Sequence, residues 1–194
     1  MGDQGGIAAS LNNLALLLSD QSDFAGARKM YDRALTSFRE IGDERGAANT
    51  MNNLANVFYS EGQLATAARM YEESRVKFNQ AGDKSGTAQE LINVGLVLAD
   101  QGDLSGAPWR FEHALAICRT LGTRSYAAYA LAGLGEVALY EGSLDEDFMA
   151  PGGHPTLDSI SQDSLPVKGW CGLAWRSRPL RLKVWRQSNA LRLS

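Results

Sequence analysis

Hydrophobic and small residues recur along the first two thirds of this chain with a period of 40 residues. Two of the shared registers hold Leu14, Leu54, Val94 and Leu134, and Tyr31, Tyr71 and Phe111. When the residues of the second copy are placed about 100° apart, apolar side chains gather on one side of a helix and asparagines on the other. The period and this amphipathic spacing predict an all-α solenoid of two-helix repeats.

The pattern predicts three complete helix pairs followed by a single helix. The expected ranges are 7–20 and 24–41, 47–60 and 64–81, 87–100 and 104–121, and 126–141. Gly82 closes a helix because glycine readily adopts the left-handed conformation, and Asp83 or Ser85 can cap the helix that follows. Pro108 predicts a kink or a delayed helix start, since proline donates no backbone hydrogen bond. We interpret the neighbouring Trp109 as a packing residue.

The second copy carries its repeat signature at Met51, Leu54, Ala55, Phe58, Ala67, Tyr71 and Ser74. The first copy matches through Leu11, Leu14, Ala15, Leu18, Ala27, Tyr31 and Ala34, and the third through Leu91, Val94, Gly95, Leu98, Ala107, Phe111 and Ala114. Over residues 6–146 the chain resembles the tetratricopeptide repeat. The resemblance implies a right-handed solenoid of antiparallel helix pairs that binds other proteins. The 40-residue length resembles the branch that includes Pins-type adaptors and the regulatory arrays of bacterial signalling proteins.

Residues 147–194 leave the 40-residue register and hold four of the five prolines. Between Lys168 and Arg192 there are seven basic residues, no acidic ones, and interleaved tryptophans. We expect this basic tail to be largely disordered. Its composition suits RNA or an acidic membrane surface, but it is also what a shifted reading frame would produce.

Charge divides the chain in the same place. Residues 1–146 carry 12 Lys and Arg against 19 Asp and Glu, whereas residues 147–194 carry 7 against 3. Two cysteines, Cys118 and Cys171, give neither a disulfide framework nor a zinc site, and no apolar run is long enough to span a bilayer. We therefore expect a cytoplasmic protein, and the 14 Arg against 5 Lys indicate a bacterial source. The abrupt start at the first repeat indicates a piece of a longer array or of a larger regulator.

The sequence contains no catalytic, metal-binding or cofactor-binding constellation. His113 and His154 lie in different regions, and acidic groups such as Glu72-Glu73 are typical of solvated faces. We expect no enzymatic activity, no cofactor and no small-molecule substrate.

In the tetratricopeptide repeat family, the first helices line a concave face that contacts the ligand. The residues that the resemblance assigns to peptide binding are Asn12, Asn49, Asn52, Asn53, Asn56, Tyr59, Gln89, Ile92, Leu96 and Tyr129. A side-chain amide both donates and accepts, so a row of amides can pair with the main chain of an extended peptide. Asn52 and Asn56 point away from the packing face and are expected to contact the ligand. For Asn13, Asn53 and Asn93, holding neighbouring helices together is an equal alternative.

The sequence therefore predicts a protein-protein interaction module that binds a peptide or a helix of a partner in its concave groove. We expect it to be the regulatory part of a bacterial signalling protein. The alternative is binding of nucleic acid or an acidic surface through the basic tail. The apolar residues of the last helix also predict self-association through the C-terminal edge of the array, through Leu131, Leu134, Val137 and Leu139.

Overall fold

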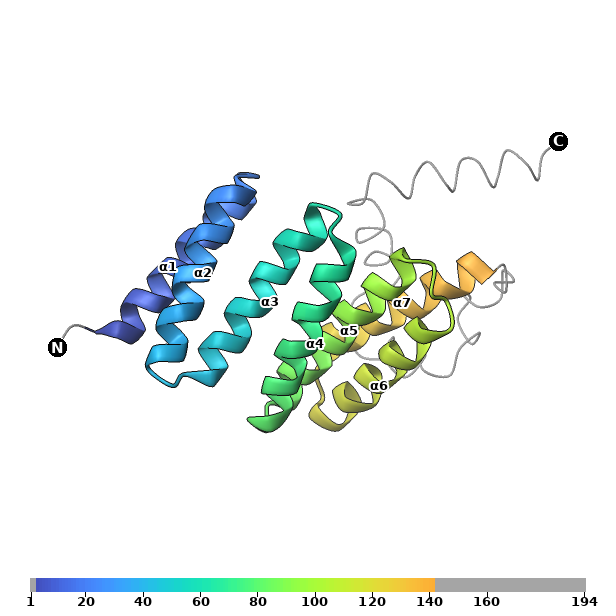
Figure 1. The fold of residues 1–194 in the computed structure, drawn as a ribbon. Coiled ribbons are helices and arrows are strands. Elements are labelled where there is room, and N and C mark those ends of the chain that lie inside the picture. Colours follow the sequence, from blue (N-terminus) through green and yellow to red (C-terminus); the bar gives the residue numbers. More distant parts are fainter. Residues whose placement is uncertain (1–2, 142–194) are drawn as a thin grey trace. The chain divides into compact units, whose positions relative to one another are not determined.

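The computed structural model describes residues 3–141, which form seven α-helices (Figure 1). These are α1 (Gln4–Asp20), α2 (Phe24–Glu40), α3 (Glu44–Ser60), α4 (Leu64–Gln80), α5 (Lys84–Asp100), α6 (Gly106–Leu121) and α7 (Arg124–Glu141). We call α1, α3, α5 and α7 the first helices and α2, α4 and α6 the second helices. The predictions for residues 147–194 lie outside the described residues.

Each described helix packs against the next one in the chain. The first helices are also neighbours of one another, since α1 contacts α3 and α5 contacts α7. No strand occurs among residues 3–141. The predicted all-α solenoid, with three helix pairs and one further helix, is confirmed.

The same short turn joins each helix to the next one. One residue in every turn has φ between 63° and 82°, and these residues recur every 20 positions, at Ser22, Gly42, Gly62, Gly82, Gly102 and Gly122. The next residue donates its N–H to a carbonyl five positions back, as Asp43 does to Phe38 at 2.9 Å. This pairing is the Schellman motif, which satisfies carbonyls at the end of the helix. The turns within and between repeats are therefore alike, and the 40-residue repeat consists of two 20-residue halves.

Aspartate caps start α1, α3 and α5 three residues earlier than the sequence pattern predicts. The Asp43 carboxylate accepts the backbone N–H of Gly46 at 2.8 Å, and Asp3 and Asp83 cap α1 and α5 in the same way. The helices begin at 4, 44 and 84 rather than at about 7, 47 and 87, because the apolar periodicity becomes visible only after this capped first turn.

Pro108 delays the start of α6. By the 40-residue register α6 would begin at Leu104, as α4 begins at Leu64, but it begins at Gly106. Pro108 then lies in the first helical turn, where a backbone N–H has no partner within the helix. Of the two predicted outcomes, the delayed start is the one observed.

Trp109 does not pack in the core, so that interpretation is wrong. Its side chain is 56% exposed, because position 109 falls in the register of the exposed residues Lys29 and Arg69. The indole ring instead contacts two side chains of its own helix. The His113 ring centroid is 5.3 Å away, and the Arg110 guanidinium lies 4.9 Å from the indole centroid.

At the first two boundaries between repeats, an aromatic ring packs against a glycine, which has no side chain. A Cβ atom placed on Gly86 would lie 2.5 Å from the Phe78 ring, so only glycine fits there. The preceding boundary repeats this arrangement with Phe38 and Gly46. At the third boundary the sizes are exchanged, with Cys118 on the second helix and Tyr126 on the first helix. Cys118 is buried, and burial is the largest cause of the raised pKa of the Tyr126 phenol, with Asp83 and Cys118 adding to it.

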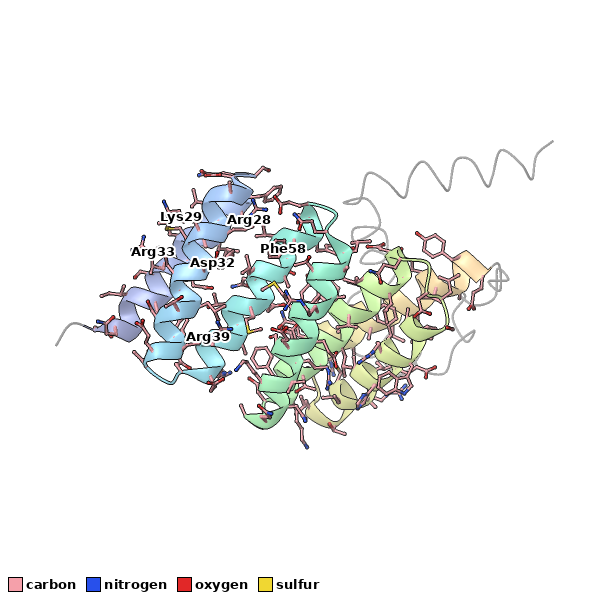
Figure 2. All side chains as sticks on the ribbon, in the orientation of Figure 1. Arg28, Lys29, Asp32, Arg33, Arg39 and Phe58 are labelled. Atoms are coloured by element: carbon pink, nitrogen blue, oxygen red, sulfur yellow. The ribbon has the colours of Figure 1, made fainter. Side chains whose placement is uncertain are left out.

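Charged side chains of the second helices α2 and α4 reach carboxylates at the two ends of α3, and Figure 2 labels Arg28 of α2 and Phe58 of α3. Arg28 of α2 pairs with Glu61 at 2.5 Å, and its guanidinium lies 5.9 Å from the centroid of the Phe58 ring. Lys77 of α4 pairs with Glu44 at 2.5 Å. Surface pairs of this kind contribute about 0–1 kcal/mol each, so the stacking of the helices depends mainly on the buried side chains between them.

Ser22 is the one non-glycine residue with positive φ among the described residues, and this predicts a stabilising substitution. A Cβ atom is disfavoured in the left-handed region, so Ser22→Gly is expected to raise the free energy of unfolding by about 0.5–1 kcal/mol. Urea denaturation followed by circular dichroism measures this change.

Gly62→Ala provides the matched control, because a Cβ atom at Gly62 would have no neighbour within 4 Å. The substitution therefore tests only the cost of placing a Cβ atom in the left-handed conformation. We expect the free energy of unfolding to fall by about 1 kcal/mol. If both variants unfolded at the same urea concentration as the parent, the left-handed turns would not limit stability.

Candidate functional site

Asparagine side chains join α1, α3 and α5 in one hydrogen-bonded row. Asn53 Nδ2 donates to Asn12 Oδ1 at 3.2 Å. Asn52 Nδ2 donates to Asn53 Oδ1 at 3.3 Å, and Asn93 Nδ2 donates to Asn52 Oδ1 at 3.0 Å. We call these four residues the asparagine ladder. It connects the first helices of three successive repeats through polar side chains alone.

Burial divides the predicted peptide-binding residues into two groups. Exposed or half-buried are Asn12, Asn49, Asn53, Asn56, Tyr59, Gln89, Leu96 and Tyr129. Asn52 and Ile92 are buried, with only 7% and 4% of their surfaces exposed. Asn52 is less accessible than its position on the polar stripe predicts, because its amide lies against Asn93 of α5. Each of these two residues therefore has only a small surface that a ligand could contact.

Tyrosine hydroxyls hold two of the accessible amides. Asn56 Oδ1 accepts the hydroxyl of Tyr71 at 2.6 Å, and Gln89 Oε1 accepts the hydroxyl of Tyr126 at 2.9 Å. In both amides the oxygen is therefore occupied, and neither nitrogen donates a hydrogen bond within residues 3–141. Tyr59 donates its hydroxyl to the carboxylate of Asp100. The accessible part of this face thus presents mainly amide N–H groups.

The ladder ends on a buried carboxyl group. Glu90 of α5 is fully buried, and its Oε2 accepts Asn93 Nδ2 at 3.4 Å. Its Oε1 lies 3.2 Å from Ser74 Oγ, which is also 2.9 Å from the backbone oxygen of Ala48. Burial raises the pKa of Glu90 to about 8, although the hydrogen bond from Asn93 acts in the opposite direction.

Sequence reasoning missed Glu90. The equivalent residues in the other copies are Ser10, Thr50 and Ala130. Glu90 therefore occupies a repeat position where the other copies have small residues. This difference between the copies is the sequence signal that could have identified Glu90. Ser74 shows the same kind of mismatch, since the other second helices have Ala34 and Ala114 at that position.

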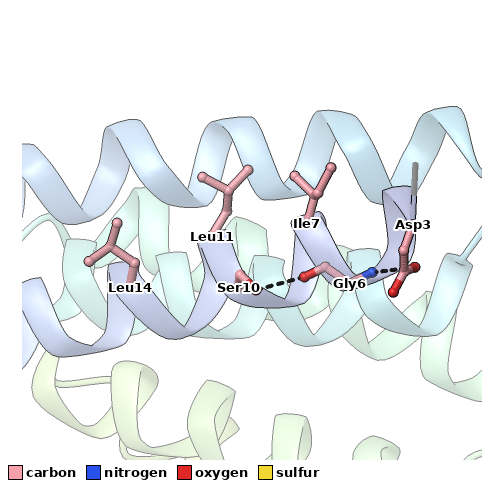
Figure 3. A pocket seen from close by; sticks show the side chains of 6 residues that line it. All are labelled: Asp3, Gly6, Ile7, Ser10, Leu11 and Leu14. Atoms are coloured by element: carbon pink, nitrogen blue, oxygen red, sulfur yellow. Dashed lines mark hydrogen bonds between the residues drawn. The ribbon is translucent and has the colours of Figure 1, made fainter. Parts of the chain in front are cut away.

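A shallow hollow lies on the outer side of α1 (Figure 3). Its lining consists of Asp3, Gly6, Ile7, Ser10, Leu11 and Leu14. Leu14 is 45% exposed, whereas its equivalents Leu54 and Val94 are 4% and 5% exposed. The difference arises because α2 packs against α3 and α4 packs against α5. Helix α1 therefore displays the surface that a second helix covers in the later repeats.

At the other end of the array, the structure limits the surface predicted for self-association. Leu131 and Val137 of α7 are buried, and Leu134 is half-buried. The side chain of Leu139 lies outside the described part. Self-association through this edge stays a prediction.

Within residues 3–141, no group of three or more His, Cys, Asp or Glu side chains could hold a metal ion. None of the described helices combines the length and the apolar character needed to cross a bilayer.

The sequence of residues 6–75 matches the family described as tetratricopeptide repeat. Among curated proteins there is no matching relative. Solved structures with a similar fold include BtubC (BKLC) from P. vanneervenii, which is 22% identical with a TM-score of 0.69. That match covers 86% of this chain and 68% of BtubC.

Two further structures share the fold at lower identity. The Rap conjugation gene regulator of plasmid pLS20, solved in complex with the Phr* peptide, is 18% identical with a TM-score of 0.60. That match covers 76% of this chain and 45% of the regulator. The TPR-like repeats of a candidate kinesin light chain from Podosopora anserina are 13% identical with a TM-score of 0.54, and the match covers 99% and 97% of the two chains. With its repeat signature and its consecutively packed helix pairs, the array is similar to the tetratricopeptide repeat family, whose model matches residues 6–75.

Proposed function

We propose that the face formed by the first helices, which we call the first-helix face, binds a main-chain segment of a partner protein. The observation that carries this proposal is the set of accessible amides with unused N–H groups, at Asn49, Asn56 and Gln89. An extended peptide presents carbonyl oxygens at regular intervals, and such amides can donate to them whatever the peptide's side chains are.

Accessible apolar side chains on the first-helix face complement the amides. Tyr59 and Leu96 are half-buried, and Tyr129 is 45% exposed. We propose that these three residues contact apolar side chains of the partner segment. Asn52 and Ile92 then support this face from within, and Asn12 and Asn53 contribute through the exposed parts of their amides.

The shared fold of the Rap regulator, which was solved with a bound peptide, supports a peptide as the ligand class. A regulatory role in a cytoplasmic bacterial signalling protein is part of the same proposal. Its support is the resemblance to regulatory repeat arrays, together with the arginine-rich composition.

Asn56→Ala should weaken peptide binding. In the complex, a peptide carbonyl would lose its donor, so we expect a loss of about 1–3 kcal/mol in binding free energy. Peptides selected from a phage-displayed library of random 12-residue sequences serve as probes, and fluorescence anisotropy gives the affinity. Asn79→Ala is the matched control, because Asn79 is an exposed asparagine on the second helix α4.

Two outcomes would refute the proposal that the first-helix face binds the peptide. In one, Asn56→Ala binds the selected peptides as tightly as the parent, and Asn79→Ala does not. In the other, the library yields no peptide that binds the first-helix face.

The same substitution, asparagine to alanine, should destabilise the protein at position 52 but not at position 49. Asn52→Ala removes a buried amide and takes one hydrogen bond each from Asn93 Nδ2 and Asn53 Oδ1, so the free energy of unfolding should fall by about 1–3 kcal/mol. Asn49→Ala alters an exposed side chain and should change it by no more than about 0.5 kcal/mol. Equal urea midpoints for the two variants would show that the ladder adds nothing to the stacking of the helices.

A further inference from the structure

A proton count at Ser74 determines the protonation of Glu90. The Ser74 hydroxyl has one hydrogen, but its oxygen lies within bonding distance of two groups that usually accept, the Ala48 carbonyl at 2.9 Å and Glu90 Oε1 at 3.2 Å. A backbone carbonyl can only accept, so the shorter contact uses the Ser74 hydrogen. The longer contact is then a hydrogen bond only if Glu90 Oε1 carries the proton and donates it to Ser74 Oγ.

With the proton on Oε1, the other oxygen of Glu90 can only accept. Oε2 therefore faces the Asn93 amide nitrogen, which donates one hydrogen to it and the other to Asn52 Oδ1. If the Asn93 amide were flipped, its oxygen would face two acceptors. The carboxyl group thus sets the orientation of Asn93.

The orientation of Asn93 passes along the ladder to α1. Because Asn52 Oδ1 accepts from Asn93, its nitrogen is turned to donate to Asn53, and Asn53 donates in turn to Asn12. Every bond therefore runs in one direction, from α5 towards α1. Within the described residues, the unused groups at the two ends are Asn93 Oδ1, an acceptor, and Asn12 Nδ2, a donor.

We propose that Glu90 is a positioning residue of the first-helix face, whose buried neutral carboxyl group gives every hydrogen bond of the asparagine ladder the same direction. One consequence rests on the proposed function. A ladder with a donor at the α1 end and an acceptor at the α5 end favours one orientation of a bound main chain. The ladder's direction itself does not depend on any ligand.

The surroundings of Glu90 agree with a neutral group. Ser74 faces it from α4, and the titratable groups around it include Tyr126 of α7, Asp83 and Cys118 of α6. Burial is the largest cause of the raised pKa of the Tyr126 phenol. Burial raises the pKa of Glu90 to about 8, and no cationic side chain of residues 3–141 contributes to that shift. A neutral acid needs no partner of opposite charge, whereas a buried carboxylate would.

Two substitutions separate positioning from mere space filling. Glu90→Gln keeps both roles, since its amide N–H can donate to Ser74 and its oxygen can accept from Asn93. Glu90→Met keeps a similar volume but removes both roles. Glu112→Met, at an exposed glutamate of α6, is the matched control. The full chain is labelled with ¹⁵N, and NMR follows hydrogen exchange of the asparagine side-chain amides without any ligand.

We expect protected side-chain amides of Asn53 and Asn93 in the parent, Glu90→Gln and Glu112→Met. In Glu90→Met, exchange should accelerate at least about fivefold at Asn93 and also at Asn53, which lies two bonds further along the ladder. Unchanged exchange at Asn53 in a folded Glu90→Met protein would overturn the proposal. Equal loss of protection in Glu90→Gln and Glu90→Met would overturn it as well.

The pH dependence of stability gives a second readout. The folded protein holds the Glu90 proton more tightly than the unfolded chain, so the stabilising contribution is complete below pH 4.5 and is lost as the pH rises to about 8. The melting temperature of the parent should fall across this range, and that of Glu90→Gln should fall less. Identical profiles would show that Glu90 is already ionised in the folded protein, which contradicts the proposal.

These measurements separate the two levels of inference. If the amide and pH results hold but no peptide binds the first-helix face, the proposed function fails and the role of Glu90 stands. If peptides bind but exchange at Asn53 is insensitive to Glu90→Met, the positioning role fails and the function stands.

Discussion

The recurrence of a left-handed residue every 20 positions is the constraint on which the rest of this structure depends. Each such residue ends a helix after a fixed length, and the first five helices all contain 17 residues. Equal helices joined by equal turns keep each helix in the same relation to its neighbours. Residues 40 positions apart therefore occupy equivalent environments, and a side-chain row can extend over several repeats.

Contacts between first helices are offset by one residue from the repeat length. Asn12 pairs with Asn53, Asn52 pairs with Asn93, and Tyr59 pairs with Asp100, and each pair is separated by 41 positions. The common offset shows that successive first helices are related in the same way along the array. Two adjacent asparagines in one helix can then act together, one bonded to the preceding repeat and the other to the following repeat.

The sequence predicts the helices and their order because the apolar periodicity and the turn glycines are local signals. It predicts less about individual side chains. Asn52 and Asn56 lie on the same stripe, yet Asn52 is buried and Asn56 is exposed, since only Asn52 meets an asparagine of the next repeat. Periodicity gives the direction of a side chain from its own helix axis, whereas burial depends on which residue the neighbouring helix supplies. Glu90 was missed for the same reason, because its partner Ser74 comes from the neighbouring helix α4.

The exchange of large and small residues between the second and third boundaries restricts how the array could be rearranged. A helix pair with a phenylalanine in its last turn fits before Gly46 or Gly86. Before Tyr126 the same pair would place two aromatic rings where the boundary has room for one. The third pair, which ends in Cys118, would leave a void if it preceded a glycine. Although the repeats share one backbone plan, they are therefore not interchangeable modules. Duplication or recombination of single repeats would have to carry both sides of a boundary together, so the unit that can be moved is an interface rather than a helix pair.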